Sequence, residues 1–185
     1  MRFIEALCAF QPDCEQERGD VRMMRHYAEI FPDLLERTNE TAHFTASAWI
    51  VNQTHSHVLM IYHNIYNSWS WTGGHADGQD DPLAVALKEA REETGIQHIH
   101  PAQENTFSAE ILTVKAHVKR GKYVVPHLHL NLTYLLEADE KDAVSIKPDE
   151  NSGVKWFDPA EALAVCTEPE MIPIYKKLIA RVQAL

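Results

Sequence analysis

A short segment in the middle of the chain, from Asp80 to Gly95, combines clear helix boundaries with a concentration of acidic side chains. Asp80 or Asp81 can cap a helix whose first turn contains Pro82. Gly95 suits a left-handed exit after Thr94. The segment therefore predicts one helix with defined ends.

Three glutamates gather on one face of this predicted helix. At about 100° per residue, its apolar side chains fall on another face, whereas Glu89, Glu92 and Glu93 lie together. Like charges at these spacings destabilise a helix by about 0.2–0.5 kcal/mol per pair. A solvated acidic face tempered by Lys88 and Arg91 is one interpretation. A site for hard cations such as Mg²⁺ or Mn²⁺, which offset the repulsion, is the other.

The charge balance limits the partners of the chain. The formal net charge is −10, from 27 acidic and 17 basic residues, and no cluster of Lys and Arg stands out. This argues against a nucleic-acid-binding module, which concentrates positive charge. No apolar stretch approaches the roughly 18–20 residues that span a bilayer, and the first residues lack the apolar core of a signal peptide. We expect a cytoplasmic protein with no membrane partner and with reduced thiols at Cys8, Cys14 and Cys166.

The hydrophobic pattern predicts an α/β (α+β) fold with a mixed sheet between helices. Residues 1–40 read as a helical N-terminal extension packed on a main domain of residues 41–185. Residues 106–119 and 122–138 are rich in β-branched and aromatic side chains and predict a central hairpin that turns at Arg120 and Gly121. Four aromatic residues ahead of the segment from Asp80 to Gly95 are expected to pack in the core rather than stack on a base: Tyr62, Tyr66, Trp69 and Trp71.

The sequence from Gly74, GHADGQDDPLAVALKEAREETGI, closely resembles the Nudix box. That motif has a glycine, five residues, an acid, seven residues, then a basic residue, glutamate, an aliphatic, one residue, two glutamates, one residue, glycine and an aliphatic. The positions that match as they stand are Gly74, Glu89, Glu92, Glu93, Gly95 and Ile96. Asp80, Lys88 and Ala90 depart from the usual glutamate, arginine and bulkier aliphatic residue.

The resemblance implies a Nudix-like α/β/α sandwich and a hydrolase. Members of that family cleave a diphosphate linkage in a nucleoside diphosphate derivative or related small molecule and use Mg²⁺ or Mn²⁺. The resemblance makes Glu89, Glu92 and Glu93 metal ligands, with the backbone carbonyl of Gly74 as a further oxygen ligand. The catalytic base is either a box glutamate or Glu150, which occupies a region where these enzymes often place another glutamate. The resemblance also agrees with a homodimer.

His75, Lys88 and His127 are further candidates for substrate binding. His75 follows the glycine pair, which the resemblance places near the phosphate site. Lys88 keeps a positive charge beside the glutamates but lacks the planar fork of arginine. His127 and His129 alternate along a predicted strand, so both side chains face one side, where they can line a pocket, hold a soft metal or simply be satisfied histidines.

Two rival functions share the predicted fold. One is a catalytically silent sensor or regulatory module that binds a nucleotide, although retention of all three glutamates favours catalysis. The other is an isomerase, which relies on a cysteine beside the substrate. None of the three cysteines lies in a strand near the predicted pocket, so this reading ranks last.

Overall fold

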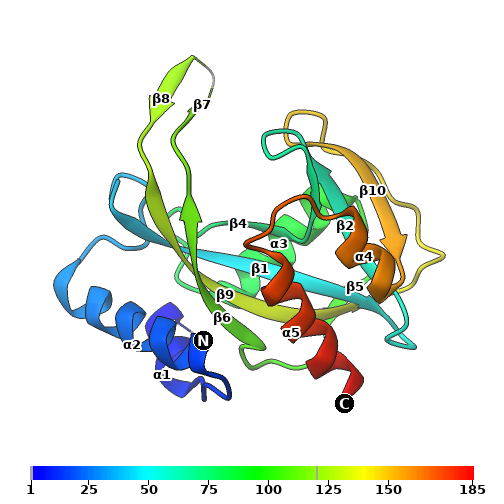
Figure 1. Cartoon of the computed structure of the whole chain (residues 1–185), viewed down its shortest axis with the longest axis horizontal. Helices are drawn as coiled ribbons and strands as arrows, with labels where there is room; N and C mark the ends of the chain where they lie inside the picture. The colour runs from blue at the N-terminus through cyan, green and yellow to red at the C-terminus, as the bar shows by residue number, and fades with distance from the viewer. Residues whose placement is uncertain (1, 120) are drawn as a thin grey trace. The chain divides into compact units, whose positions relative to one another are not determined.

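The computed structural model describes residues 2–119 and 121–185, and within these it contains five helices and ten strands (Figure 1). Arg120, which the sequence placed in a turn, lies outside the described residues. The chain divides into two units, each treated by itself below. The first comprises Met1–Ser47, Gly73–Ala86 and Glu104–Tyr134, and the second comprises Ala48–Thr72, Leu87–Gln103 and Leu135–Leu185.

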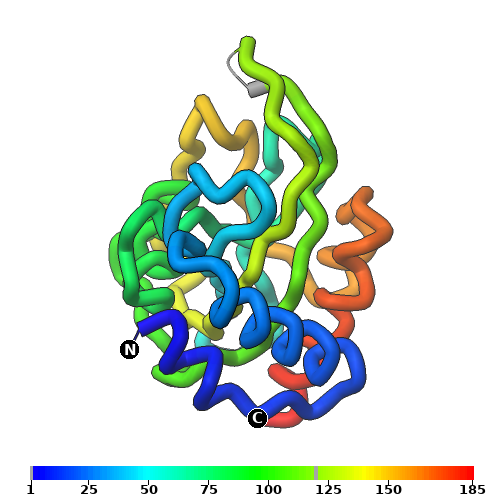
Figure 2. The backbone as a smooth tube through the Cα atoms, turned by 90° about the vertical axis from the view of Figure 1, so that its left-hand side faces the viewer, coloured from blue at the N-terminus to red at the C-terminus, as the bar shows by residue number. Residues whose placement is uncertain are grey.

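The first unit combines two N-terminal helices with an antiparallel strand pair. Figures 1 and 2 show α1 and α2 side by side. Its elements are α1 (Phe3–Ala9), α2 (Glu15–Ile30), the first part of β1 (Ala42–Asn52), most of β4 (Thr72–His75), the start of α3 (Pro82–Thr94), β6 (Ser108–Val114), β7 (His117–Lys119), β8 (Lys122–Val124) and most of β9 (His127–Ala138).

The predicted central hairpin is present in this unit. β6 pairs antiparallel with β9 from Ser108↔Thr133 to Val114↔His127, and β7 pairs with β8 beyond it. The pairing is interrupted before β9, where Pro126 has no N–H to donate to a ladder. The predicted hairpin is therefore confirmed, but it consists of four strands, β6 to β9, where two long strands were expected.

Helix α2 covers the edge of β6 that β9 leaves open. Gln16 Nε2 donates to the carbonyl of Ala109 at 3.1 Å, and Asp20 Oδ2 accepts from the backbone N–H of Ile111 at 3.0 Å. Such contacts occupy backbone groups that an edge strand otherwise exposes. The helical character of the N-terminal residues is confirmed, whereas a domain boundary after residue 40 stays a prediction.

A buried polar network ties three strands of the first unit together. Asn131 on β9 is fully buried, and its Oδ1 accepts from Thr45 Oγ1 at 3.0 Å and from Ser47 Oγ at 2.8 Å on β1. Its Nδ2 donates to Thr133 Oγ1 at 3.0 Å and to Glu110 Oε2 at 3.3 Å. Because buried polar groups are costly unless they are hydrogen-bonded, this network specifies how these strands pair.

The second unit is built on an antiparallel sheet with helices α4 and α5. β10 pairs with β2 through Asn151↔His63 and Phe157↔Val58, and β2 pairs with β1 and β3. Its elements are the end of β1, β2 (Val58–His63), β3 (Ser68–Ser70), the end of α3, β5 (Ile99–Pro101), the end of β9, β10 (Asn151–Phe157), α4 (Pro159–Val165) and α5 (Ile172–Gln183).

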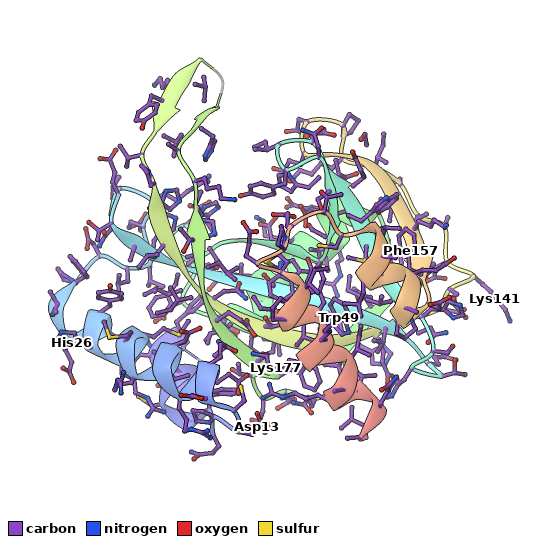
Figure 3. All side chains as sticks on the ribbon, in the orientation of Figure 1. Asp13, His26, Trp49, Lys141, Phe157 and Lys177 are labelled. Carbon is purple, nitrogen blue, oxygen red and sulfur yellow. The ribbon has the colours of Figure 1, made fainter. Side chains whose placement is uncertain are left out.

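Aromatic side chains form the core of the second unit. Tyr175 of α5 is fully buried, and its ring lies 5.1 Å from that of Trp49 and 5.6 Å from that of Trp71 (Figure 3 labels Trp49 beside α5). Trp69 packs edge-on against Phe157 at 4.8 Å.

The expectation of packing is confirmed for the buried Trp71 and for the half-buried Trp69 and Tyr62, whose rings contact each other. It is wrong for Tyr66, which lies exposed after β2.

Two sequence-based expectations concern the whole chain. The three cysteines are free thiols, as expected. Of the helices that the structure describes, none has the length and apolar character needed to cross a membrane.

The buried network predicts a large effect of an isosteric substitution on β9. Thr133→Val removes a hydroxyl that donates to Glu110 Oε2 at 2.9 Å and accepts from Asn131. Because both partners stay buried without it, we expect the free energy of unfolding to fall by about 1–3 kcal/mol, measured by urea denaturation. The same change at Thr113, exposed on β6, is the control and should stay within about 0.5 kcal/mol. Equal effects of the two substitutions would contradict the network's importance.

Candidate functional site

Helix α3 has the boundaries that the sequence predicts. Asp81 Oδ1 accepts from the backbone N–H groups of Leu83 at 3.1 Å and Ala84 at 3.2 Å, which caps the helix. Asp80, the other candidate cap, instead binds Arg2 and the N–H of Phe3. The cap is therefore Asp81, and the first helical residue is proline, whose missing N–H costs nothing there.

Two of the three glutamates of α3 are buried. Glu89 is 9% exposed and Glu93 is 3% exposed, whereas Glu92 lies at the surface. The interpretation of a solvated acidic face is therefore wrong for Glu89 and Glu93. A carboxylate removed from water needs compensating charge or hydrogen bonds, and Glu89 Oε1 accepts from Lys88 Nζ at 3.0 Å. The hydrogen bond to Glu89 is the main reason that the pKa of Lys88 is raised.

The C-terminal end of α3 is fixed against the segment that leads into β10. Gly95 has φ +76°, and a Cβ on it would lie 2.1 Å from Ser145 Oγ. The N–H of Ser145 donates to the carbonyl of Thr94 at 2.8 Å. The fully buried Asn151 donates from Nδ2 to the carbonyl of Glu93 at 2.9 Å. These contacts satisfy carbonyls that a helix end leaves unpaired and hold the glutamates in place.

Lys147 joins two acidic side chains that lie far apart in the sequence. Its Nζ is 2.9 Å from Glu92 Oε2 and 3.0 Å from Glu150 Oε2. Burial opposes its charge, but the hydrogen bonds to Glu92 and Glu150 outweigh that effect and raise the pKa of Lys147. In return, the hydrogen bond from Lys147 is the main cause of a lowered pKa at Glu92, with Lys88 contributing. Glu92 is thus held as a carboxylate.

The structure brings together four of the predicted site residues within the second unit. Lys88, Glu89, Glu92 and Glu150 are linked through a chain of ion pairs in which Lys147 is the connection that sequence reasoning missed. No periodicity or motif singled out Lys147, because its significance depends on how the segment before β10 folds. Glu93, one turn from Glu89, completes the acidic group.

The other predicted site residues belong to the first unit. Gly74 and His75 lie on β4, next to Gly73. A Cβ added to Gly73 would lie 2.4 Å from Ser47 Oγ, so this position has room only for glycine. His127 lies at the start of β9 beside His129, and the prediction that the two face one side is confirmed by an Nε2–Nε2 distance of 3.2 Å.

The acidic group of α3 has the chemistry of a hard-cation site. Carboxylate oxygens at helix positions i, i+3 and i+4 are the ligand type that Mg²⁺ and Mn²⁺ prefer. A divalent ion would offset the repulsion among three carboxylates of which two are buried. The residues present therefore fit such an ion, and Glu89, Glu92 and Glu93 are those that would hold it.

Comparisons with known proteins agree with this geometry. The family model of the NUDIX domain matches residues 41–182. A search of curated proteins found no match. Among solved structures, an Ap4A hydrolase from C. elegans in a binary complex is 20% identical, with a TM-score of 0.57 over 77% of this chain and 98% of that chain.

Two further structures show the same fold. A NUDIX family hydrolase from Clostridium perfringens is 18% identical, with a TM-score of 0.56 over 76% of this chain and 97% of that chain. The dihydroneopterin triphosphate pyrophosphohydrolase of E. coli is 15% identical, with a TM-score of 0.53 over 75% of this chain and 95% of that chain. The expected fold class is confirmed.

Because Ser145 lies against the C-terminal end of α3, we expect a side chain at Gly95 to lower the free energy of unfolding. Gly121 has nearly the same backbone angle, φ +77°, with nothing within 4 Å of an added Cβ, so it is a matched control. We expect Gly121→Ala to cost about 1–2 kcal/mol of unfolding free energy from the left-handed backbone alone. Gly95→Ala should cost about 1–3 kcal/mol more, because Ser145 must move. Denaturant unfolding of both variants measures the difference, and equal losses would mean that the contact with Ser145 is dispensable.

Proposed function

The chain belongs to the NUDIX domain family of pyrophosphohydrolases, which act on phosphorus-containing acid anhydrides, and we propose that it cleaves the diphosphate linkage of a nucleoside diphosphate derivative or a related small molecule with Mg²⁺ or Mn²⁺. The observation that carries the proposal is the set of three glutamates on α3, two of them buried at 9% and 3% exposure. Burial of acidic groups is costly. A bound cation that also contacts phosphate would offset that cost and serve the reaction.

Each glutamate of α3 has a proposed role as a metal ligand. When bound, a divalent ion neutralises charge on phosphate oxygens and acidifies water near neutral pH. Lys147 and Lys88 lower the pKa of Glu92 and so keep it in the carboxylate form that binds a metal ion. Asn151 fixes the backbone of Glu93. Since the protein supplies placement and charge rather than covalent chemistry, the rigidity of the helix end is part of the proposed catalysis.

The proposed general base is Glu150, with a glutamate of the box as the alternative. Glu150 is only partly exposed, and Lys147 holds its carboxylate 3.0 Å away while also holding Glu92. Its N–H donates to the carbonyl of Lys147 at 2.8 Å, and its carbonyl accepts from the N–H of Asn64 at 2.9 Å. A carboxylate fixed in this way can take up a proton from the attacking water at a constant position.

Lys88 is proposed to contact the anionic substrate, because it is exposed and carries a positive charge beside the glutamates. The roles of the Gly74 carbonyl in metal binding and of His75 in substrate binding stay predictions from the family resemblance. A role of His127 in substrate binding stays a prediction from its place on the strand. A homodimer and a cytoplasmic location also stay predictions. A nucleic acid is not proposed as a partner, since the chain has a net charge of −10.

Metal-dependent turnover is the first test. The wild type with Mg²⁺ or Mn²⁺ is expected to release phosphate, monophosphate or pyrophosphate from a panel of dinucleotides, nucleoside sugars and triphosphates, and a chelator should abolish release. Glu93→Gln should lower kcat/KM on the order of 100-fold or more, because a direct metal ligand matters at least as much as the groups that support one. Glu161→Gln neutralises an exposed helical glutamate and should leave turnover unchanged.

Binding of nucleotides by the wild type without metal-dependent release would contradict the proposed hydrolysis and would instead indicate a sensor. Circular dichroism of Glu93→Gln separates loss of chemistry from loss of fold, because Glu93 is buried.

Substitution of Glu150 distinguishes whether this residue acts as a proton acceptor or as a metal ligand. Glu150→Gln should lower kcat by about 10²–10⁴-fold while leaving the apparent affinity for Mg²⁺ within a few fold of the wild type. The neighbouring exposed Asp149→Asn is the matched control and should keep its activity. A normal kcat in Glu150→Gln would assign the base to the box glutamates instead.

A further inference from the structure

Four histidines meet in the first unit, although they come from separate strands. His43 lies on β1, His75 ends β4, and His127 and His129 lie on β9. The ring of His43 is 4.8–5.1 Å from those of the other three. His129 is also 4.8 Å from His75 and 5.0 Å from His127. Two of the four, His43 and His129, took no part in the proposed function.

The nitrogen atoms of this cluster have the spacing of metal ligands. One ring nitrogen each from His43, His75 and His129 lie within 4.8 Å of one another. The Nε2 atoms of His127 and His129 are 3.2 Å apart. Two nitrogens bound to one tetrahedral Zn²⁺ at about 2.0–2.1 Å are separated by about 3.3 Å, so this pair already has that spacing.

His43 has a buried ring nitrogen that the described residues leave unpaired. Its Nδ1 lies 2.9 Å from the carbonyl oxygen of Asn39, and because a carbonyl only accepts, Nδ1 carries the hydrogen. Nε2 of a neutral ring then presents a lone pair. The residue is 4% exposed, and within the described part of the chain this Nε2 has no hydrogen-bond partner. A buried acceptor without a partner is costly and needs an explanation.

Backbone carbonyls orient two of the rings in the manner of metal-binding histidines. Asn39 accepts from Nδ1 of His43, and Val125 accepts from Nδ1 of His127 at 2.8 Å, so both rings direct Nε2 away from the backbone. Asn39 is itself held, because its Oδ1 accepts from the N–H of Thr41 at 3.1 Å. Metal-ligating histidines almost always donate their other N–H to such a group.

Burial favours the neutral imidazole at two of the four rings, His43 and His129. Burial first, and then the neighbouring histidines, lower the pKa of His129 to about 2. Burial likewise lowers the pKa of His43 despite the hydrogen bond to Asn39. Since a metal binds the deprotonated imidazole, these two side chains need to lose no proton before they coordinate.

We propose that His43, His75 and His129, with His127 as the fourth ligand, form a binding site for a divalent transition-metal ion such as Zn²⁺ or Co²⁺. Imidazole nitrogens favour such borderline ions, whereas carboxylate oxygens favour Mg²⁺ and Mn²⁺. The site therefore differs in chemistry from the glutamates of α3, and it does not depend on the proposed hydrolysis. An ion there would fasten the start of β1, the end of β4 and the start of β9.

Cobalt provides a direct test, because Co²⁺ bound by imidazole nitrogens absorbs visible light. The full chain carrying Glu89→Gln, Glu92→Gln and Glu93→Gln is titrated with Co²⁺ in excess Mg²⁺. We expect a saturable absorption change equivalent to a single ion and displaced by Zn²⁺, as in the wild type. Loss of the signal in a triple variant whose circular dichroism matches that of the wild type would assign the ion to the glutamates and overturn the proposal.

Histidine variants of the triple-Gln chain locate the ion. His129→Ala and His75→Ala should each weaken Co²⁺ binding on the order of 100-fold or more. His98→Ala, whose side chain is 89% exposed, is the matched control and should bind as before. His75 is only half-buried, so its variant keeps the test decisive if His129→Ala fails to fold. Undiminished binding by His75→Ala would overturn the proposal, whatever the outcome of the hydrolysis assays.

Discussion

The fixed end of helix α3 is the constraint on which the acidic group depends. Gly95 turns the chain at φ +76°, Ser145 closes on it, and Asn151 holds the last turn through the carbonyl of Glu93. An acidic helix end is unfavourable by itself, because like charges repel and the macrodipole places its negative end there. Tertiary contacts with the segment before β10 offset that cost, and so they permit three carboxylates to stay together.

The positive charges of the neighbouring lysines offset the negative charge of this acidic group. Lys88 contacts Glu89 and Glu92, and Lys147 contacts Glu92 and Glu150. The pairs at Glu92 are partly exposed, so they contribute little to stability and can be exchanged for a cation at small cost. A chain with a net charge of −10 that is proposed to act on an anionic diphosphate needs such local positive charge together with metal ions.

The two units contain proposed metal ligands of different chemical character. The second unit presents carboxylate oxygens on a helix, which suit hard cations, and the first presents imidazole nitrogens on strands, which suit borderline ones. Hydrogen bonds to backbone carbonyls occur in both groups: Asn151 donates to the carbonyl of Glu93 and so holds the helix backbone, and His43 donates to the carbonyl of Asn39 and so orients its ring. Ligands that are held in place before an ion binds lose less conformational entropy when it binds, and this argument applies to both groups.

The sequence alone determined the local features: a helix start capped by Asp80 or Asp81, the left-handed exit at Gly95, the glutamates of α3 on one helix and the shared face of His127 and His129. These follow from backbone preferences and from the periods of helix and strand, which act over a few residues. Only the tertiary structure decided that Glu89 and Glu93 are buried, that Lys147 joins Glu92 to Glu150 and that His43 meets His129. The contacts of Lys147 with Glu92 and of His43 with His129 join residues tens of positions apart. No local period encodes the strand pairing and loop path that bring them together.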